Sequence, residues 1–347
     1  MATKIPASDD IAWPGAAGSA VDAQGECRFG DARAEAAAAL SGDVIVPLTQ
    51  LGAIRASGAD AETFLQNQLS GDVRALTADA AQLSSYSSPK GRVLALFTLF
   101  RAGDAIVLEL RRELLAAALK RLRMYVLRSK LSLDDASGAL PALGLAGAGA
   151  AGLLGAAGLP VPPSDWGCAR DGEVLVMRRP GAVPRYSVHG PGERLAALWA
   201  ACSAHARPAG SAAWRLLDIG AGLPSIRPAT ADQFVPQMLN LDRLGAISFT
   251  KGCYPGQEIV ARLHYLGNLK RRMFGGHCAA GEPAAGMPVH AAGGDGQPVG
   301  SIVEAAPDAQ GGYALLAVLS LGLDPGADLR LGAVDGAALK FDWSEVV

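Results

Sequence analysis

The pattern of hydrophobic residues changes character once along this chain, close to Phe274, and the change limits the folds open to it. Before this residue, short strand-like runs alternate with segments whose apolar residues recur at helical spacing. After it, Gly and Pro separate many short apolar runs, and helical periodicity disappears. Mixed strands and helices indicate α+β units. Closely spaced short strands with frequent turns indicate a small β-barrel.

Turn residues and helical runs divide the 347 residues into four segments. We expect residues 1–43 to form a poorly ordered tail, because their first half is dominated by Ala, Gly, Pro and Asp. We expect a first α+β domain over residues 44–137 and a second over residues 138–274. Residues 275–347 are the expected barrel domain. The length agrees with two or three domains of roughly 100–200 residues each.

Hydrophobic spacing predicts the elements of the two α+β domains. Strands are expected at residues 44–48, 52–57, 82–86, 93–100, 106–110, 130–133, 140–147, 173–179 and 185–190. Helices are expected at residues 59–69, 111–127, 148–155, 191–206 and 211–220.

Composition excludes several classes of protein. The formal net charge of −2 argues against a protein whose main task is to coat nucleic acid. The five cysteines are scattered and contain no CxxC pair, which favours reduced thiols in a cytosolic compartment and indicates no closed zinc site. No apolar run reaches the ~20 residues that a membrane helix needs, and the first residues lack the pattern of a secretory signal. We therefore expect a cytoplasmic protein that binds no membrane.

The stretch KGCYPGQEIVAR at residues 251–262 is the strongest candidate for chemistry. Gly252 and Gly256 permit sharp turns on both sides of Cys253. Residues 257–262 follow in helical register, so the loop is expected over a helix N-terminus, whose N–H groups attract anions. This position, with Lys251 nearby, favours the ionised and reactive form of a thiol.

Other interpretations of this stretch remain open. Cys253 could be a small residue that fills a turn, with the neighbouring charges solvated. A Cys/His dyad requires a histidine nearby in space, and the chain has five histidines. Metal binding is not expected, because no Cys or His stands at ligand spacing from Cys253.

The run ATADQFVPQMLNLDRLGAISFTKGCYPGQEIVARLHYLGNLKRRMF resembles the signature of the YgfZ folate-binding family, which is related to the aminomethyltransferase (T-protein) of the glycine cleavage system. The core pattern K-G-C-Y-x-G-Q-E matches without a gap at Lys251, Gly252, Cys253, Tyr254, Gly256, Gln257 and Glu258. Segments in the first predicted domain and the barrel-like end extend the resemblance over residues 44–347.

The resemblance implies three domains around a central cavity that binds tetrahydrofolate or a one-carbon derivative of it. It also implies a role in making or maintaining iron–sulfur proteins, including an enzyme that modifies tRNA. A tryptophan before the signature contacts folate in relatives, and Trp214 stands at that place. Its indole suits stacking on a pterin, although Trp214 could equally be an ordinary core aromatic.

The chain also departs from the aminomethyltransferases. Leu94, Ala95 and Leu96 occupy the region where those enzymes carry an acidic pair. Their Leu-Glu-Ala-Gly segment is represented by residues 219–222, so the glutamate that could bind a pterin is replaced by Gly220. Asp218 lies two residues away and is the candidate replacement. A second family tryptophan corresponds to Leu51. These losses argue against aminomethyl transfer to or from a lipoyl group.

Two basic stretches, residues 111–130 and 270–272, form local positive patches in a nearly neutral chain. These patches suit polyglutamyl folate tails or RNA phosphate. Alternatively, they are solvated helix faces on which the aliphatic stems of the Lys and Arg side chains pack against apolar surface. No aromatic RNA-binding motif accompanies them, so we predict no direct nucleic-acid binding. The expected partners are folate and iron–sulfur client proteins, and we expect a monomer.

The sequence thus supports three functional hypotheses. The first is a folate-binding accessory protein for iron–sulfur proteins that uses Cys253 as its thiol and is not a conventional enzyme. The second is a folate-dependent one-carbon transferase, and the third is a thiol redox or hydrolytic enzyme. In the first, Lys251 favours the thiolate and Arg262 binds a folate carboxylate. Further binding residues are expected to be Trp214, Tyr254, Gln257, Glu258 and Asp218.

Overall fold

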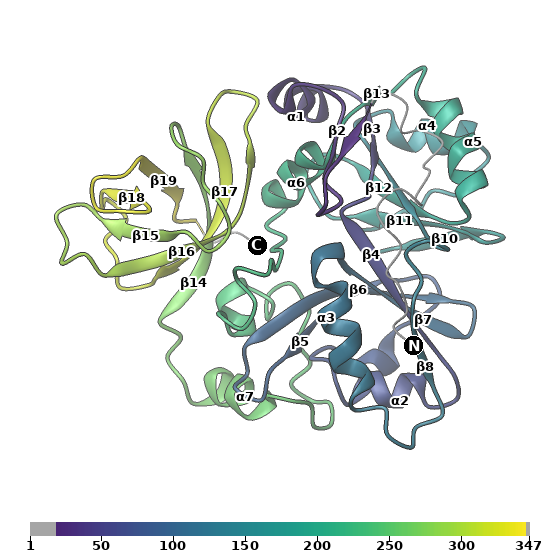
Figure 1. Cartoon of the computed structure of the whole chain (residues 1–347), viewed down its shortest axis with the longest axis horizontal. Coiled ribbons are helices and arrows are strands. Elements are labelled where there is room, and N and C mark those ends of the chain that lie inside the picture. Colours follow the sequence, from purple (N-terminus) through teal and green to yellow (C-terminus); the bar gives the residue numbers. More distant parts are fainter. Residues whose placement is uncertain (1–18, 345–347) are drawn as a thin grey trace.

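Two sheet-based units and a β-barrel make up this computed structural model, which describes residues 19–344 (Figure 1). The expected fold class, two mixed α/β units followed by a C-terminal barrel, is confirmed. In Figure 1 the barrel lies to the left of the two units, and helix α6 (Ser211–Gly220) lies between the barrel and the upper unit.

The first unit is a five-stranded antiparallel sheet in the order β5-β6-β7-β4-β8. Its strands are β4 (Leu51–Ser57), β5 (Gln82–Ser87), β6 (Val93–Ala102), β7 (Ala105–Arg111) and β8 (Ser132–Asp135). Helices α2 (Ala61–Gln66) and α3 (Arg112–Arg123) accompany it. The apolar residues of α3 recur at helical spacing, and the resulting stripe is buried against the sheet.

The second unit is a six-stranded sheet in the order β10-β11-β12-β9-β3-β13. Its strands are β3 (Val44–Pro47), β9 (Ala142–Ala146), β10 (Cys168–Asp171), β11 (Val174–Arg179), β12 (Arg185–His189) and β13 (Arg207–Pro208). Helices α4 (Ala150–Ala156) and α5 (Gly192–Cys202) pack on it. Strand β3 precedes the first sheet in sequence, but it pairs here with β9 and β13. All four of its residues are buried, as an interior position in a covered sheet requires.

Residues 19–43 are ordered, so the expectation of a poorly ordered tail is wrong for this part; residues 1–18 lie outside the described residues. A short hairpin of β1 (Ala20–Val21) and β2 (Cys27–Arg28) leads into helix α1 (Ala32–Ser41). Asp31 caps α1 by accepting the N–H of Ala34 at 2.8 Å. The alanines on the buried face of α1 let it approach α6 closely, a tertiary contact that composition alone does not reveal.

The C-terminal unit is a closed six-stranded barrel in the order β14-β17-β16-β15-β18-β19. Its strands are β14 (Arg271–Cys278), β15 (Pro288–Ala291), β16 (Pro298–Pro307), β17 (Tyr313–Ser320), β18 (Leu329–Leu331) and β19 (Ala338–Asp342). Alternate residues fill the barrel interior, while Val303, Leu316 and Val318 join the main core of the first unit. Val303, Leu316 and Val318 thus lie on the outside of the barrel, and their burial fixes the barrel against the rest of the molecule.

Apolar side chains also hold the two sheets together. Phe100 and Val107 of the first sheet share a buried cluster with Leu175 and Met177 of the second. No helix within residues 19–344 is both long and apolar enough to cross a membrane.

Candidate functional site

A cavity lies where the two sheets meet α6 and the barrel; its interior volume, reachable by the centre of a water-sized sphere, is about 90 Å³, and all empty space including the open mouth is about 830 Å³. Strands β5, β6 and β7 and the start of α3 form one wall, and α6 with the following loop forms another. Glu304 of β16 is the barrel's contribution. Apart from Glu304, the lining residues are Gln50, Leu51, Leu83, Leu96, Phe97, Thr98, Glu109, Leu110, Arg111, Leu114, Trp166, Arg179, Trp214, Arg215, Asp218, Leu223, Pro224, Ser225 and Ile226. Apolar walls with a few polar groups are typical of small-molecule sites.

Two of the predicted site residues, Trp214 and Asp218, line this cavity from one face of α6. They stand four residues apart, which places them on the same side of the helix. The indole is 3% exposed, and the guanidinium of Arg185 lies 5.2 Å from its ring centroid. Arg185 Nη1 also donates to Asp218 Oδ1 at 2.7 Å. Trp214 is therefore both a packed core residue and part of the cavity wall.

The signature loop is anchored to the first unit through Lys251. Its Nζ donates to the carbonyl oxygens of Leu69 at 2.7 Å and Gly71 at 2.8 Å. Burial lowers the pKa of Lys251 to about 8. The same Nζ lies 5.3 Å from the ring centroid of Tyr254, a buried residue whose pKa burial raises to about 12. The ammonium group thus binds backbone oxygens, which gives it an anchoring role in the loop.

Cys253 is exposed at the tip of this anchored loop. Helix α7 (Gln257–Tyr265) begins four residues later, so the thiol precedes the helix and does not lie in its first turn. Glu258 stands in the first turn of α7 and Arg262 in the last, and both side chains are exposed. The N–H of Gln257 donates to the carbonyl oxygen of Tyr254 at 3.1 Å, which closes the turn into the helix.

The structure separates the predicted site residues into two groups. Trp214 and Asp218 line the cavity, whereas none of Lys251, Cys253, Tyr254, Gln257, Glu258 and Arg262 is among its lining residues. The β5–β6 turn connects the two regions, because Gly91 of this turn contacts Gly256 and Ile259. Leu96 of β6, five residues beyond Gly91, lines the cavity. Gly91 and Leu96 lie at most about 17 Å apart along this strand, and the loop contacts the Gly91 end of it.

Three cavity residues that sequence reasoning missed form a buried polar cluster between the sheets. Glu109 on β7 accepts a charged hydrogen bond from Arg179 Nη2 on β11. Burial raises the pKa of Glu109, but the Arg179 charge, His189 and the hydrogen bonds from Arg179 and Thr98 together hold that pKa below its ordinary value. Thr98 accepts from Arg179 Nη1 at 3.2 Å. The one available signal was an acid within AIVLEL, an otherwise apolar run at residues 105–110.

Trp166 is a further cavity residue that the sequence did not single out. Its φ is +61°, in the left-handed region that large side chains rarely adopt. Both of its backbone polar groups are paired, since its N–H donates to the Arg178 carbonyl and its carbonyl accepts from Ala81. The Arg179 guanidinium lies 5.7 Å from the indole centroid. This conformation presents the ring to the cavity beside Arg179 and Glu109.

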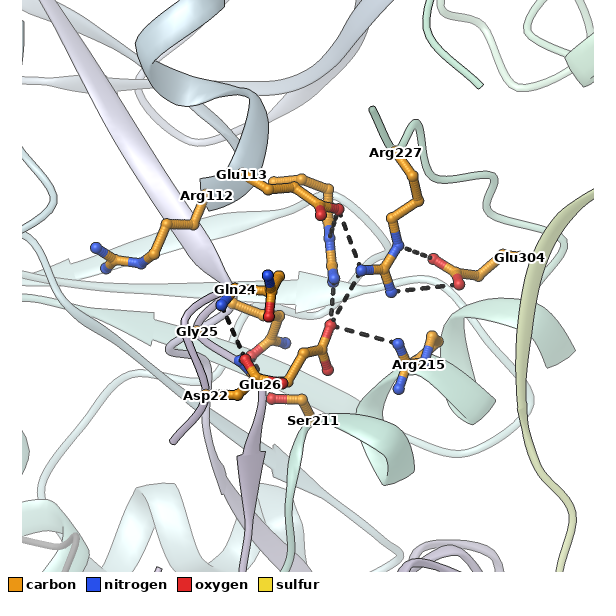
Figure 2. A network of polar contacts seen from close by, with 12 residues as sticks. Asp22, Gln24, Gly25, Glu26, Arg112, Glu113, Ser211, Arg215, Arg227 and Glu304 are labelled. Atoms are coloured by element: carbon orange, nitrogen blue, oxygen red, sulfur yellow. Dashed lines mark hydrogen bonds and ion pairs between the residues drawn. The ribbon is translucent and has the colours of Figure 1, made fainter. Parts of the chain in front are cut away.

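A second charged network joins the N-terminal hairpin, the first unit, α6 and the barrel (Figure 2). Glu26 of the hairpin pairs with Arg111, Arg215 and Arg227. Arg227 also donates to Glu113 and, through two nitrogens, to Glu304 of the barrel. Burial raises the pKa of Glu26, but the three arginines together hold it below its ordinary value. The network balances three guanidinium groups against three carboxylates and fixes the barrel in place.

No group of three His, Cys, Asp or Glu side chains within residues 19–344 is placed to hold a metal ion. Leu96 lines the cavity in the region where the aminomethyltransferases carry acids, so the wall is hydrocarbon at this point.

The chain is similar to several proteins named tRNA-modifying protein YgfZ. The one from Edwardsiella ictaluri is 36% identical over 281 residues, which cover 80% of this chain and 85% of the relative. The one from Serratia proteamaculans is 32% identical over 298 residues, which cover 83% and 87%. No family model matches the chain.

Among solved structures, the chain resembles the glycine cleavage system aminomethyltransferase T from Bartonella henselae. The TM-score is 0.75 with 17% sequence identity, and the match covers 91% of this chain and 89% of that protein. At this identity the likeness shows a common fold.

Proposed function

The chain belongs to the YgfZ family of tRNA-modifying proteins, and from this premise we propose that it binds a reduced folate in its central cavity and supports iron–sulfur proteins, among them an enzyme that modifies tRNA. Cys253 is its functional thiol in this proposal. The protein acts as an accessory factor, with folate as its bound cofactor.

The observation that carries the proposal is the cavity at the junction of the three units. It is lined by two indole rings, by aliphatic walls and by six charged side chains, those of Glu109, Arg111, Arg179, Arg215, Asp218 and Glu304. A pterin is a flat, polar-edged ring, and indole faces or edges with fixed hydrogen-bonding groups suit it. The shared fold with an aminomethyltransferase T is consistent with a ligand at this junction.

Cys253 fits the role of a thiol that meets a partner protein or a reactive ligand group at the surface. It is exposed, and Lys251 holds its loop to the turn at Leu69 and Gly71. A thiol must be accessible to react, and a rigid loop presents it in one geometry. The separation between Cys253 and the cavity lining suits an accessory role, in which folate binding and thiol contact take place on neighbouring parts of the molecule.

Titration of the purified protein with tetrahydrofolate tests the binding. We expect saturable heat in calorimetry and quenching of tryptophan fluorescence. Trp214→Phe and Trp166→Phe should each reduce the quenching, because both indoles line the cavity. Trp199→Phe is the matched control, since Trp199 stacks on Phe29 outside the cavity lining. Absence of both heat and quenching in the wild type would refute folate binding.

Complementation of a deletion strain tests the cellular role. The wild-type gene should restore the tRNA nucleosides made by iron–sulfur enzymes, measured by mass spectrometry of hydrolysed tRNA. Cys253→Ala should fail to restore them at equal protein level, whereas Thr250→Ala, an exposed neighbour in the same loop, should succeed. Full restoration by Cys253→Ala would remove the thiol from the proposal.

A further inference from the structure

A groove distinct from the central cavity lies beside helix α3, and we call it the α3 groove. Its walls come from α3, from strands β5 and β6 and from the loop after α6. The volume reachable by the centre of a water-sized sphere is about 330 Å³, against about 90 Å³ in the central cavity. Among the described residues, Leu114 alone lines both spaces. The volume of the α3 groove falls within the roughly 300–1,000 Å³ of small-molecule sites.

Small apolar side chains leave this groove open. Ala95 of β6, Ala117 and Ala118 of α3 and Ala231 of the loop all line it, and none of these side chains extends beyond its Cβ. Met124, which follows α3 and is 58% exposed, also lines the groove. A methionine side chain is unbranched and adapts its shape to a ligand. The walls therefore suit an apolar body and do not demand one exact shape.

The charged residues of the lining are both basic, namely Lys120 and Arg121. Within the described part of the chain, neither forms an ion pair with a carboxylate, whereas Arg123, outside the lining, pairs with Asp134. Burial raises the pKa of Tyr86, another lining residue, and the charge of Arg121 and a hydrogen bond from it oppose that rise. The Arg121 guanidinium thus lies beside the Tyr86 hydroxyl at the groove, without an acid to neutralise it.

An apolar groove bordered by cations without acidic partners favours ligands that are both apolar and negatively charged. The apolar part of such a ligand removes hydrocarbon walls from water. Its anionic group gains charged hydrogen bonds from an ammonium and a guanidinium group. A neutral ligand of the same shape gains the apolar contact alone, and a cationic ligand is repelled.

We propose that the α3 groove is a second ligand site, which binds a small carboxylate carried on an apolar aliphatic or aromatic body. Lys120 and Arg121 bind the carboxylate, and the alanines and Met124 contact the apolar body. The proposal goes beyond the proposed function, because it holds whether or not the central cavity binds folate.

The competing explanation is a packing gap, left by short side chains between helix and sheet and filled by solvent. The two explanations differ in what they predict for matched ligands. A packing gap shows no preference for an anion, whereas a binding site prefers the anion and loses its ligand when the groove is filled.

The first experiment changes the ligand and leaves the protein intact. Anilinonaphthalene sulfonate, an aromatic anion that fluoresces in apolar surroundings, serves as the probe, and decanoate and decanol serve as competitors. We expect saturable binding of the probe, and displacement by decanoate at about fivefold lower concentration than by decanol, because only decanoate is charged. Equal displacement by the two competitors, or no saturable binding of the probe, would overturn the proposal.

The second experiment fills the groove. Ala117→Trp should weaken probe binding by about tenfold or more, because the indole occupies the space of the ligand. Ala116→Trp is the matched control, since Ala116 is the preceding residue of α3, is likewise exposed and does not line the groove. It should bind the probe as the wild type does. Retained binding in Ala117→Trp, or an equal loss in both variants, would place the probe elsewhere and overturn the assignment.

The third experiment removes the positive charges. The double variant Lys120→Gln/Arg121→Gln should lose the preference for decanoate and keep its affinity for decanol. Arg128→Gln is the control, because Arg128 is an exposed cation of the same basic stretch outside the groove lining. A preference retained by the double variant, or lost in Arg128→Gln, would overturn the role of the two residues. If the double variant does not fold, Lys120→Gln decides, because Lys120 is exposed and its preference should fall by about half.

Discussion

Cys253 differs from the other cysteines in exposure, and this difference defines its chemistry. All five cysteines lie within the described residues, and Cys253 alone is exposed. Burial raises the pKa of Cys27 and of Cys168 to about 11, and it also raises the pKa of Cys202 and Cys278. Buried neutral thiols react slowly with alkylating reagents.

We therefore predict that the native protein reacts rapidly with one equivalent of a thiol reagent. Mass spectrometry of the digested product should place the label on Cys253. The variant Cys253→Ala should react with less than a tenth of an equivalent in the same time, and its unfolding free energy should change by no more than about 0.5 kcal/mol, since the side chain is exposed. Rapid labelling of a second cysteine would contradict the burial described here.

The lowered pKa of Lys251 leads us to predict that the stability of the protein depends on pH. Its pKa is about 8 in the folded protein and 10.5 in the unfolded chain. Between these values the unfolded chain binds more protons, so this group makes the folded state more stable as pH rises from about 8 to about 10.5. The side chain is partly exposed, so we expect a gain on the order of 1 kcal/mol.

Urea unfolding of the wild type and of Lys251→Met at several pH values measures this effect. The wild type should gain stability relative to the variant between pH 8 and pH 10, and other groups cancel in the difference. A constant difference across that range would mean that the two carbonyl oxygens at Leu69 and Gly71 compensate for the burial of the ammonium group.

At the scale of single residues, the sequence singled out Cys253 as a candidate because a thiol between two glycines is a local pattern, and its functional role stays a prediction. It did not reveal Glu109, Arg179 and Trp166 as cavity residues. They come from β7, from β11 and from the loop before β10, and only the packing of the two sheets brings them together. A single sequence holds no signal for such a contact.

The junction of α7 with the β5–β6 turn depends on two glycines. Gly256 has a φ of +81° and precedes the first turn of α7. A Cβ at Gly256 would lie 2.6 Å from the Cα of Gly91 and 2.6 Å from the carbonyl oxygen of Ser88. Both the backbone conformation and the close contact therefore require glycine.

We predict that Gly256→Ala destabilises the protein by about 2 kcal/mol or more, measured by chemical denaturation. Gly252→Ala is a control in the same loop, because a Cβ there meets no atom within 4 Å. It should change the free energy of unfolding by less than about 0.5 kcal/mol. Equal effects of the two substitutions would show that the Gly91 contact has no energetic role.

At the scale of elements, hydrophobic spacing predicted the strands and helices from β4 to α6 with shifts at their ends, except for the short strands β10 and β13, which were missed. Helix α3, for example, was expected over residues 111–127 and spans Arg112–Arg123. The N-terminal hairpin and α1 were missed. The alanine face of α1 is only weakly apolar, and its stability comes from packing on α6 and from the Asp31 cap.

The whole molecule is held together by the charged network around Arg227 as well as by apolar packing. Arg227 contacts carboxylates from the hairpin, from α3 and from the barrel. Glu304, its partner on the barrel, is 4% exposed. Removal of one partner from a buried pair leaves the other charge buried without compensation.

We predict that Arg227→Met lowers the free energy of unfolding by about 3–5 kcal/mol and loosens the barrel from the other two units. Scanning calorimetry should show a lower or divided transition. The control is Arg330→Met, which removes an exposed pair with Asp328 within the barrel and should cost no more than about 1 kcal/mol. An unchanged transition in Arg227→Met would mean that apolar contacts alone hold the barrel.

The pairing of β3 with strands from much later in the chain has a consequence during synthesis. When β3 leaves the ribosome, its neighbour β9 is still roughly a hundred residues from being made, a delay of about 5–20 s at a synthesis rate of about 5–20 residues per second. The five strands of the first sheet emerge in that interval and can fold behind it. During this interval the nascent chain carries β3, an apolar strand, without the strands that cover and pair with it in the folded protein.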